Sequence, residues 1–288
     1  MEENNQIRIS VCVTTMNASV ELDNCLRSLW ISEVKPDFVV VSDDSSDPKI
    51  QQQNQNITQY YPETIYVIGP HQGVCANRNC AFRAVPPTDL VAFIDDDICV
   101  EPDFIAKVIA RYQTLSPKIR RRTFLTGGTP TKLSFRGYFS PSKEPRCVDL
   151  HTAVFPVAFF QVEKWDEKIF FGYEDAILCL KAIKNGFEIL HCPELKVNDT
   201  RLGESTLNTG GMGKLTQYEI YIEAARLYVG IERYKNIFPN RLKLITFLLI
   251  YFIHMNIFLF RKNAIKAWSE IIKYSHFKKF FFTVLKGS

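Results

Sequence analysis

Short, continuous apolar runs recur along the first 200 residues, and several of them end in polar or acidic side chains. These runs are IRISVCVTT (7–15), DFVVVSDDSSD (37–47), TIYVIG (64–69) and LVAFIDDD (90–97). Because their apolar parts do not alternate with polar positions, they are typical of strands that are buried on both faces. Helical spacing occurs between them, at 19–30 and 73–84. The pattern predicts an α/β fold with a Rossmann-like, mostly parallel sheet that is flanked by helices.

The second hundred residues continue this alternation less regularly. Further helices are expected at 101–113 and 174–186. Further strands are expected at 122–130, 153–162 and 187–192. The polar, Gly-rich segment 202–215 is expected to be a mobile loop. Its Gly-Lys pair lacks the glycine spacing of a phosphate-binding P-loop, which excludes that motif.

The composition is that of a folded protein without repeats. With 288 residues, 46% of them apolar, the chain can bury one large core or a domain with an appendage. Its eight cysteines form no CxxC pair and several lie in apolar runs, which predicts buried thiols in a reducing compartment. The amino-terminal sequence MEENNQIRIS has neither the basic nor the apolar region of a signal peptide. We therefore expect a cytoplasmic protein or a peripheral one on the cytoplasmic face of the membrane.

The carboxyl-terminal region differs in charge from the rest of the chain. Residues 231–288 contain eleven Lys or Arg against two acids, a formal charge of +9, so the first 230 residues contribute −5 to the net charge of +4. The 17-residue apolar segment 244–260 is bounded by basic residues and interrupted by His254 and Asn256. Its length is near the lower limit for a spanning helix. We expect 216–288 to be helical and to associate with a membrane surface through inserted apolar side chains and snorkelling Lys and Arg.

Two other uses of this region remain open. The apolar segment could pack on the preceding domain or on a second subunit, which would make a homodimer. Binding to nucleic acid is the rival use of a basic tail. The aromatic residues come as apolar blocks rather than as spaced stacking platforms, so no nucleic-acid partner is expected.

Three adjacent aspartates, Asp95, Asp96 and Asp97, follow the apolar run that begins at residue 90. Adjacent like charges are unfavourable unless a cation or a raised pKa relieves the repulsion. Ligands bind at the carboxyl ends of parallel strands, so one cleft is expected to collect these aspartates with Thr14, Thr15, Asp43 and Asp44. A solvated strand end that caps the next helix would also explain them. The functional alternative is Mg²⁺ or Mn²⁺, held by carboxylate and diphosphate oxygens.

Two acidic pairs have similarly divided explanations. Asp43 and Asp44 could form an Asx-type turn, or one of them could accept a hydrogen bond from a nucleobase or ribose. Glu174 and Asp175 follow the segment FFGY and could stabilise the start of a helix through its dipole. Alternatively, one of these two carboxylates could be a general base whose pKa is raised by desolvation. For each pair, the local sequence is compatible with both the structural and the functional explanation.

The motifs together, in their order along the chain, resemble the family 2 glycosyltransferases. These are inverting enzymes with a nucleotide-sugar-binding α/β domain of the glycosyltransferase A type. The matching segments are ISVCVTTMN (9–17), VVVSDDSSD (39–47), GVCANRNCA (73–81), FIDDDICVEPDF (93–104) and WDEKIFFGYEDAILCLKAIKNGF (165–187). The fourth resembles the D-x-D metal motif and the fifth the acceptor-side E-D motif of the family. The resemblance spans about residues 7–200.

The resemblance implies a donor site for a nucleoside-diphosphate sugar, formed by Thr14, Asp44, Arg78, Asp95 and Asp96. Among these, Asp44 would contact the base and Arg78 would lie close to the nucleotide. A divalent cation, Mn²⁺ or Mg²⁺, would be bound by Asp97 and Asp95, with Asp97 the first choice as direct ligand. A UDP-sugar is favoured because uridine donors are the most frequent in the family.

On the acceptor side, the resemblance implies that Asp175 is the catalytic base and that Glu174 orients it or touches the acceptor. The reaction would be a direct displacement that inverts the anomeric configuration. Residues 1–215 would form the catalytic domain, with a nucleotide-sugar half at 1–100 and an acceptor half at 101–215. The acceptor would be a saccharide, and a lipid-linked one if the tail binds membranes, as in bacterial relatives that synthesise lipopolysaccharide or other surface polysaccharides.

One family feature is missing. Many members have a histidine after the last strand that helps to bind the metal or the diphosphate. Here ELKVNDTR (194–201) offers Asn198 and Asp199 instead, and His191 is expected to be a packed strand residue.

Two rival functions are weighed against glycosyl transfer. A nucleotidyltransferase would need a Gly-rich basic loop after its first strand, which TTMNASVEL (14–22) lacks. A non-catalytic nucleotide- or saccharide-binding protein at the membrane would bind its ligand without turnover.

Overall fold

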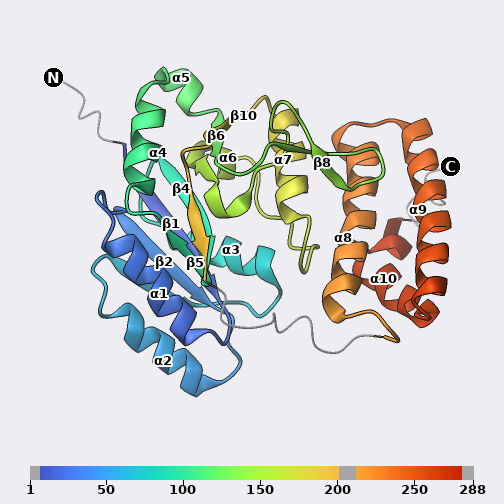
Figure 1. Ribbon diagram of the computed structural model, residues 1–288, viewed down its shortest axis with the longest axis horizontal. Helices are drawn as coiled ribbons and strands as arrows, with labels where there is room; N and C mark the ends of the chain where they lie inside the picture. Colours follow the sequence, from blue (N-terminus) through green and yellow to red (C-terminus); the bar gives the residue numbers. More distant parts are fainter. Residues whose placement is uncertain (1–6, 201–211, 281–288) are drawn as a thin grey trace.

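A seven-stranded sheet forms the centre of the molecule, with helices on both of its faces (Figure 1). This computed structural model describes residues 7–200 and 212–280. In spatial order the strands are β10 (Glu188–His191), β6 (Thr123–Thr126), β9 (Val154–Pro156), β4 (Leu90–Asp95), β1 (Ile9–Thr15), β2 (Phe38–Asp43) and β3 (Thr64–Ile68). Neighbouring strands are parallel, except that β9 is antiparallel to both β4 and β6. The predicted α/β fold with a mostly parallel sheet is confirmed.

The central strands are buried on both faces, as their continuous apolar sequences predict. Val11 and Val13 of β1 pack in the core beneath α1 (Ser19–Trp30), α2 (Pro48–Thr58) and α4 (Phe104–Gln113). Cys12 packs in the opposite core, beneath α3 (Val74–Arg83), α6 (Val157–Phe160) and α7 (Glu174–Lys184). Each large apolar side chain buried in this way stabilises the fold by about 1.5–3 kcal/mol. The two cores therefore fix both the register and the facing of the strands.

The apolar pattern does not predict helix α2. Its sequence PKIQQQNQNIT has no apolar stripe, and its buried residues are Asn54 and Thr58. The signal for its start is a cap instead: the Asp47 side chain accepts a hydrogen bond from the Lys49 N–H at 2.9 Å, and Pro48 opens the first turn. The helix thus begins where local capping chemistry, rather than periodicity, favours it.

The strand expected at 153–162 is shorter in the structure. It ends at Pro156, and Val157–Phe160 form the short helix α6. The reason lies in pairing, because β9 has ladder partners on β4 only at Leu90–Ala92. Beyond them the chain turns, and the Val157 N–H donates to the Asp89 carbonyl at 2.9 Å. The expected strand is therefore wrong after residue 156.

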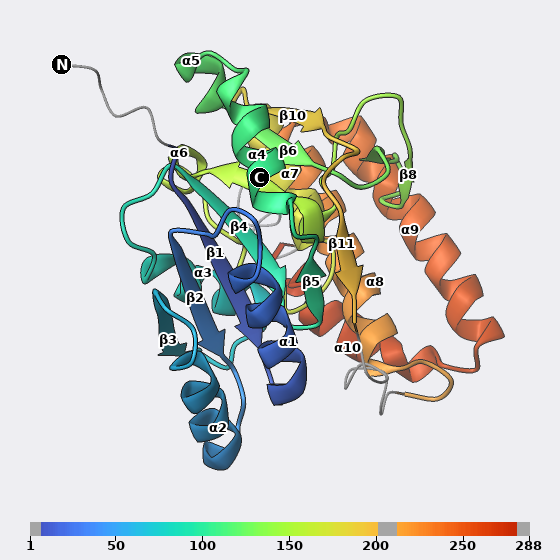
Figure 2. The same ribbon diagram turned by 60° about the vertical axis from the view of Figure 1, so that its left-hand side comes forward.

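Smaller elements complete residues 101–200 and the turn after β4. Strand β5 (Ile98–Val100) follows the three aspartates and pairs antiparallel with β11 (Val197–Asp199), beside it in Figure 2. Helix α5 (Pro117–Arg120) precedes β6. Strands β7 (Thr131–Leu133) and β8 (Phe139–Pro141) form a hairpin, and a turn of 3₁₀ helix, η1 (Leu150–Thr152), precedes β9. The β5–β11 pair brings two distant parts of the chain together beside the aspartates.

The carboxyl-terminal helices continue the main core. Helix α8 (Gln217–Glu232) leads through the π-helical turn η3 (Arg233–Ile237) to α9 (Arg241–Arg261), η4 (Ile265–Ala267) and α10 (Trp268–Tyr274). Tyr228 and Val229 of α8 belong to the core that contains α7, whereas Leu227 and Ile231 belong to the cluster shared with α9. Helix α8 is therefore packed on both sides, and α9 forms the outer layer (Figure 1).

Within the described ranges, α9 is the one helix that could cross a membrane by length and composition, and 22% of its most apolar window is buried. Those two criteria do not distinguish a spanning helix from a surface helix. The loop predicted at 202–215 lies mostly outside the described residues, as does the end of the tail beyond residue 280. All eight cysteines are free and six of them are buried, in accord with the predicted reduced thiols.

Candidate active site

Polar side chains meet where β1, β2 and β4 end. The register places Thr15 opposite Asp43 on β2 and Thr14 opposite Asp95 on β4. Because parallel neighbours end at the same edge of a sheet, Asp44 and the aspartates after β4 lie around the end of β1. The structure thus brings together residues of three strands that the sequence assigns to the donor site.

Of the acidic pair after β2, Asp43 supports the fold. It is fully buried, and its carboxylate accepts hydrogen bonds of 2.7–2.8 Å from Ser45 N–H, Asn54 Nδ2 and Tyr66 Oη. Asp44 Oδ1 accepts from the His71 N–H at 2.9 Å. Burial raises the pKa of Asp44, and the hydrogen bond from His71 opposes that rise. Among the described residues, the hydrogen bond to the Asp44 side chain goes to Oδ1, so Oδ2 can accept from a ligand.

Gly69, just after β3, leaves room for the Asp44 carboxylate. A Cβ here would lie 2.1 Å from Asp44 Oδ1 and 2.6 Å from Asn77 Oδ1. We therefore expect Gly69→Ala to displace Asp44 and to weaken binding of a nucleoside diphosphate by roughly ten-fold or more, since one charge-assisted hydrogen bond is lost. Calorimetric titration measures the affinity, and a thermal melt checks that the variant is folded. Unchanged affinity in a folded variant would contradict a nucleoside contact at Asp44.

Asp95 is contacted on both carboxylate oxygens. Oδ1 accepts from Arg78 Nη2 at 2.9 Å and from Thr14 Oγ1 at 3.2 Å. Oδ2 lies 3.4 Å from His151 Nε2. Burial opposes ionisation of Asp95, but the charges of Arg78 and then His151 hold its pKa well below the usual range. Burial likewise opposes protonation of His151, yet Asp95 raises the pKa of that imidazole. The carboxylate is thus kept ionised at the strand end.

Arg78 joins the two sides of the site. Its side chain is almost fully buried, and Nη1 donates to Glu174 Oε1 at 3.0 Å while Nη2 donates to Asp95. The guanidinium carbon lies 5.1 Å from the centre of the Trp165 ring. One guanidinium therefore links a carboxylate at the end of β4 to a carboxylate at the start of α7. Closeness of Arg78 to a nucleotide stays a prediction, because the contacts seen here are to protein groups.

Asp96 and Asp97 lie in the turn between β4 and β5. Asp96 Oδ2 accepts from the Met16 N–H at 3.4 Å. Burial, aided by the charges of Asp95 and Asp97, raises the pKa of Asp96 to about 7. The Asp97 carbonyl accepts from the Thr200 N–H at 2.8 Å and from its hydroxyl at 3.0 Å. The end of β11 is therefore attached directly to the predicted metal motif.

The candidates for the missing family histidine differ in position. Asn198 Nδ2 donates to Glu101 Oε1 at 2.7 Å, so this side chain is directed to the other end of the β5–β11 pair. Asp199 pairs with Ile98 in the ladder, next to Asp97, and its role as a ligand stays a prediction. His191 lies on β10, which β6 and β9 separate from β4.

The histidine that the structure places at the site is His151, which the sequence analysis does not identify. It lies in η1, just before β9. Because β9 is antiparallel to β4, residues before β9 reach the same edge as residues after β4, and Val154 pairs with Ala92. The sequence places His151 shortly before an expected strand, but only the antiparallel direction of β9 brings it to the edge where Asp95 lies.

Helix α7 begins with Glu174 and Asp175, the two carboxylates that the family resemblance assigns to the acceptor side. The chain enters it through Gly172 and Tyr173, whose φ values are 81° and 60°. Glu174 is buried and bound to the guanidinium described above. Burial, and then the adjacent charge of Glu174, raise the pKa of Asp175 to about 7. Asp175 can therefore accept a proton near neutral pH, as a general base must.

The side chains at the D-x-D motif suit a hard divalent cation. Asp97 and Asp95 offer carboxylate oxygens and His151 offers an imidazole nitrogen, which are ligands that Mn²⁺ accepts. Within residues 7–200 and 212–280, no group of three or more His, Cys, Asp or Glu is arranged as a metal site. One or two carboxylates are enough when phosphate oxygens supply the other ligands. The residues thus fit a cation that binds together with a diphosphate.

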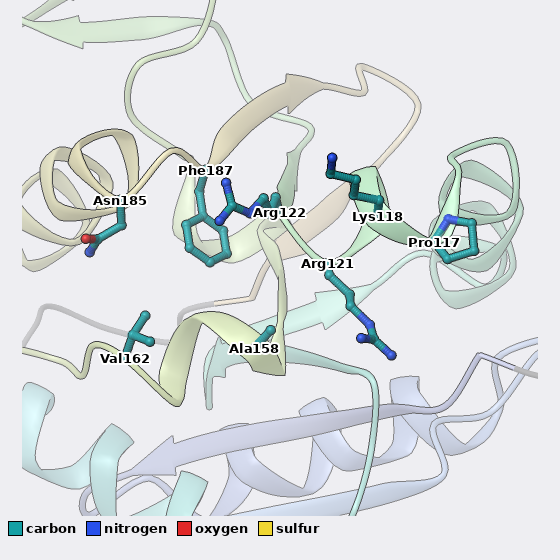
Figure 3. A pocket seen from close by; sticks show the side chains of 8 residues that line it. All are labelled: Pro117, Lys118, Arg121, Arg122, Ala158, Val162, Asn185 and Phe187. Atoms are coloured by element: carbon teal, nitrogen blue, oxygen red, sulfur yellow. The ribbon is translucent and has the colours of Figure 1, made fainter.

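A hollow of about 640 Å³ lies at the opposite edge of the sheet (Figure 3). Arg122 and Phe187, which precede β6 and β10, form part of its wall together with Lys118 and Arg121. Its place at the starts of these parallel strands separates it from the carboxylates at their ends. The hollow is therefore not part of the candidate active site.

The sequence matches the family model described as Glycosyl transferase family 2 over residues 10–160, more than half of the chain. The chain belongs to glycosyl transferase family 2. The matched range includes Thr14, Asp44, Arg78 and the three aspartates, while α7 lies beyond it. No curated protein matches the sequence.

Several solved glycosyltransferase structures share the fold of this family 2 member. GalNAc-T7, solved with UDP, GalNAc and Mn²⁺, has 12% identity and a TM-score of 0.63, and the match covers 81% of this chain and 50% of that one. TarS 1–349 from S. aureus, in complex with UDP-GlcNAc, has 17% identity and a TM-score of 0.57, covering 93% and 79%. The mannosyltransferase PcManGT from Pyrobaculum calidifontis, with GDP-Man and Mn²⁺, has 14% identity and a TM-score of 0.57, covering 82% and 66%.

These similarities establish the glycosyltransferase A-type fold for the family 2 member described here. This chain spans half the length of the GalNAc-T7 chain that it matches.

Proposed function

We propose that this protein is an inverting glycosyltransferase that moves a sugar from a nucleoside-diphosphate sugar to a hydroxyl group of a saccharide acceptor. The observation that supports this most is the buried Arg78 bridge. It holds Asp95, at the donor edge of the sheet, and Glu174, beside a candidate base, within 3.0 Å of one guanidinium. Donor and acceptor groups are thereby fixed next to each other, which a direct displacement requires.

On the donor side, Asp44 would accept a hydrogen bond from the base, and Thr14 and Asp95 would line the sugar-diphosphate. Asp97, with Asp95, would hold the divalent cation, which when bound neutralises charge on the leaving diphosphate. The His151 imidazole lies at the same edge, 3.4 Å from Asp95, which raises its pKa. A UDP-sugar is the proposed donor; UDP complexes of two fold relatives, GalNAc-T7 and TarS, support it, whereas PcManGT was solved with GDP-Man.

On the acceptor side, Asp175 would take the proton of the acceptor hydroxyl. The hydroxyl oxygen then attacks the anomeric carbon of the donor sugar, and the bond from that carbon to the diphosphate oxygen breaks. The leaving group departs as the nucleoside diphosphate, and the anomeric configuration inverts. Glu174, which is bound to Arg78, would orient Asp175 or contact the acceptor.

We further propose that the acceptor is lipid-linked and that the enzyme works on the cytoplasmic face of a membrane, in synthesis of a bacterial surface polysaccharide such as lipopolysaccharide. The basic, apolar region 231–288 supports this proposal. Peripheral attachment would bring the enzyme to an acceptor that does not leave the bilayer.

Release of nucleoside diphosphate in water tests the donor part of this proposal. We expect the wild-type protein to hydrolyse one nucleotide sugar of a panel slowly when Mn²⁺ or Mg²⁺ is present. Asp97→Ala should lower this rate by about 100-fold or more, because a charge-neutralising interaction at the leaving group is lost. Asp103→Ala, which removes a partly exposed aspartate at the start of α4 that pairs with Lys107, is the matched control and should be active. Equal rates in the two variants, or no hydrolysis of any donor by wild type, would contradict the proposed donor site.

A further inference from the structure

Helix α9 presents a continuous apolar face to solvent. Its six exposed large apolar side chains, each 50–77% accessible, are Leu242, Ile245, Leu249, Ile253, Ile257 and Phe260. At 100° per residue they fall within about 120° of the helix circumference, over its full length of 21 residues. Scattered exposed apolar residues are ordinary, but a stripe of this length marks an interaction surface.

The side of α9 opposite this face is fixed to the protein. Phe247, Tyr251, Met255 and Leu259 are almost fully buried against α8. Tyr251 Oη donates to the Glu223 carbonyl at 2.7 Å, and the Tyr251 ring lies 4.4 Å from the Arg226 guanidinium carbon. The exposed face therefore lies on the side of α9 that is turned away from α8. Helix α9 itself is the outermost helix in Figure 1.

The polar residues on the apolar face have their hydrogen bonds inside the protein. Thr246 Oγ1 donates to the Leu242 carbonyl at 2.9 Å. Asn256 Nδ2 donates to the Phe252 carbonyl at 2.9 Å, and Asn256 Oδ1 accepts from Trp268 Nε1 at 3.1 Å. Removing this face from water therefore leaves few polar groups unsatisfied, which lowers the free-energy cost of burying it.

Basic residues stand at both ends of the face. Arg241 and Lys243 lie in the first turn of α9, and Arg261 and Lys262 at its end. In a dimer formed through this face, parallel or antiparallel, a basic end of one α9 would meet a basic end of the other. Such pairing is repulsive, whereas an anionic surface would attract both ends at once. Charge thus favours a lipid surface over a second copy of the chain.

Spanning is disfavoured by the packing of α9. A spanning α9 would carry α8 into the hydrocarbon, together with the Glu223–Arg226 ion pair beside Tyr251. It would also carry the β7–β8 hairpin, whose Tyr138 ring lies 4.3 Å from the same guanidinium carbon. Charged groups and sheet edges are costly in the bilayer core. Helix α9 can therefore place its exposed face in contact with lipid, but it cannot be surrounded by lipid on all sides.

We propose that α9 lies flat in the interfacial layer of an anionic bilayer, with its six exposed apolar side chains inserted and its basic ends among the head groups. Helices α7, α8 and α9 are side by side in this order (Figure 1), and packed helix axes lie about 8–10 Å apart. The start of α7, with Asp175, is then roughly 20–25 Å from the lipid surface. Docking of α9 on the bilayer does not rest on the proposed function. The following consequence does rest on it: the reacting hydroxyl of a lipid-linked acceptor would have to lie roughly 20–25 Å above the lipid surface to reach Asp175.

Flotation with vesicles tests the docking. We expect the full chain to bind vesicles of phosphatidylcholine with phosphatidylglycerol, to bind phosphatidylcholine alone more weakly, and to lose the difference at high salt. Leu249→Ser/Ile253→Ser, in the middle of the face, should bind the mixed vesicles roughly ten-fold or more weakly. The matched control is Ile31→Ser/Ile119→Ser, at two isoleucines that are exposed elsewhere on the molecule, and it should bind like wild type.

The rate of donor hydrolysis without vesicles separates docking from the proposed function. Both double variants should retain the wild-type rate, because none of the four residues contacts the candidate active site. Loss of hydrolysis in the α9 variant alone would mean that its fold is altered. That result would contradict a role of these side chains at the surface alone. Three further results would overturn the proposal. The first is that wild type does not float with the mixed vesicles, and the second is that the control variant loses binding as the α9 variant does. The third is that wild type is a dimer in analytical ultracentrifugation whereas the α9 variant is a monomer.

Discussion

Asp175→Asn is expected to lower the rate of sugar transfer by about 10²–10⁴-fold and to leave donor affinity close to that of wild type. The amide is nearly isosteric with the carboxylate but cannot take the acceptor proton. Asp175 lies at the start of α7, one residue after Glu174, which is bound to Arg78. In the sequence it is far from the strands of the proposed donor site. Transfer kinetics with the donor and saccharide acceptor measure the rate, and titration with the donor measures the affinity.

The pH dependence of wild type gives an independent check on Asp175. Burial and the charge of Glu174 raise its pKa to about 7, so below that pH the carboxyl is protonated and cannot act as a base. We expect kcat/KM to fall by about ten-fold per pH unit below about pH 7 and to level off above it. Glu174→Gln removes the adjacent charge and should move this profile to lower pH. A profile that stays flat down to pH 5, or an Asn variant with full activity, would assign the base to another residue.

Arg78→Met is expected to have the largest effect on stability. The substitution keeps the length of the side chain but leaves Glu174, which is 11% accessible, and Asp95 without their shared cation. Removal of one partner of a buried ion pair costs about 3–5 kcal/mol. Because Asp95 is one-third accessible and retains His151, we expect the lower end of this range. Urea unfolding of wild type and variant measures the difference in the free energy of unfolding.

Two companion variants distinguish the bridge from simple packing. Arg78→Lys retains the charge but cannot bond both carboxylates in a fixed geometry, so it should restore only part of the stability. Arg78→Met/Glu174→Gln removes the unpaired buried charge, so its loss should be smaller than that of Arg78→Met alone. If the double variant is instead as unstable as the sum of the single variants, Arg78 and Glu174 are not coupled and the bridge has no energetic role.

The proposed donor edge of the site was accessible to sequence reasoning because of a general property of parallel sheets. Strands that are apolar throughout are buried on both faces, and polar residues that follow them gather at one edge. Thr14, Asp44 and Asp95 follow that logic, and the register of β1 with β2 and β4 places them together. The logic fails for a strand of the opposite direction. His151 precedes β9 and reaches the same edge because β9 is antiparallel, which no apolar run reveals.

Sequence alone determined the fold class, the order of the strands along the chain, the buried faces and the division between an acidic body and a basic carboxyl-terminal region. These follow from periodicity and charge, which are local properties of the chain. The tertiary structure decided three further features. It brings His151 to Asp95, and it lets Arg78 bond carboxylates from β4 and α7. It also decides which side of α9 is exposed to solvent. Each of these depends on how distant segments pack against one another, and a one-dimensional pattern contains neither strand direction nor the orientation of a helix about its axis.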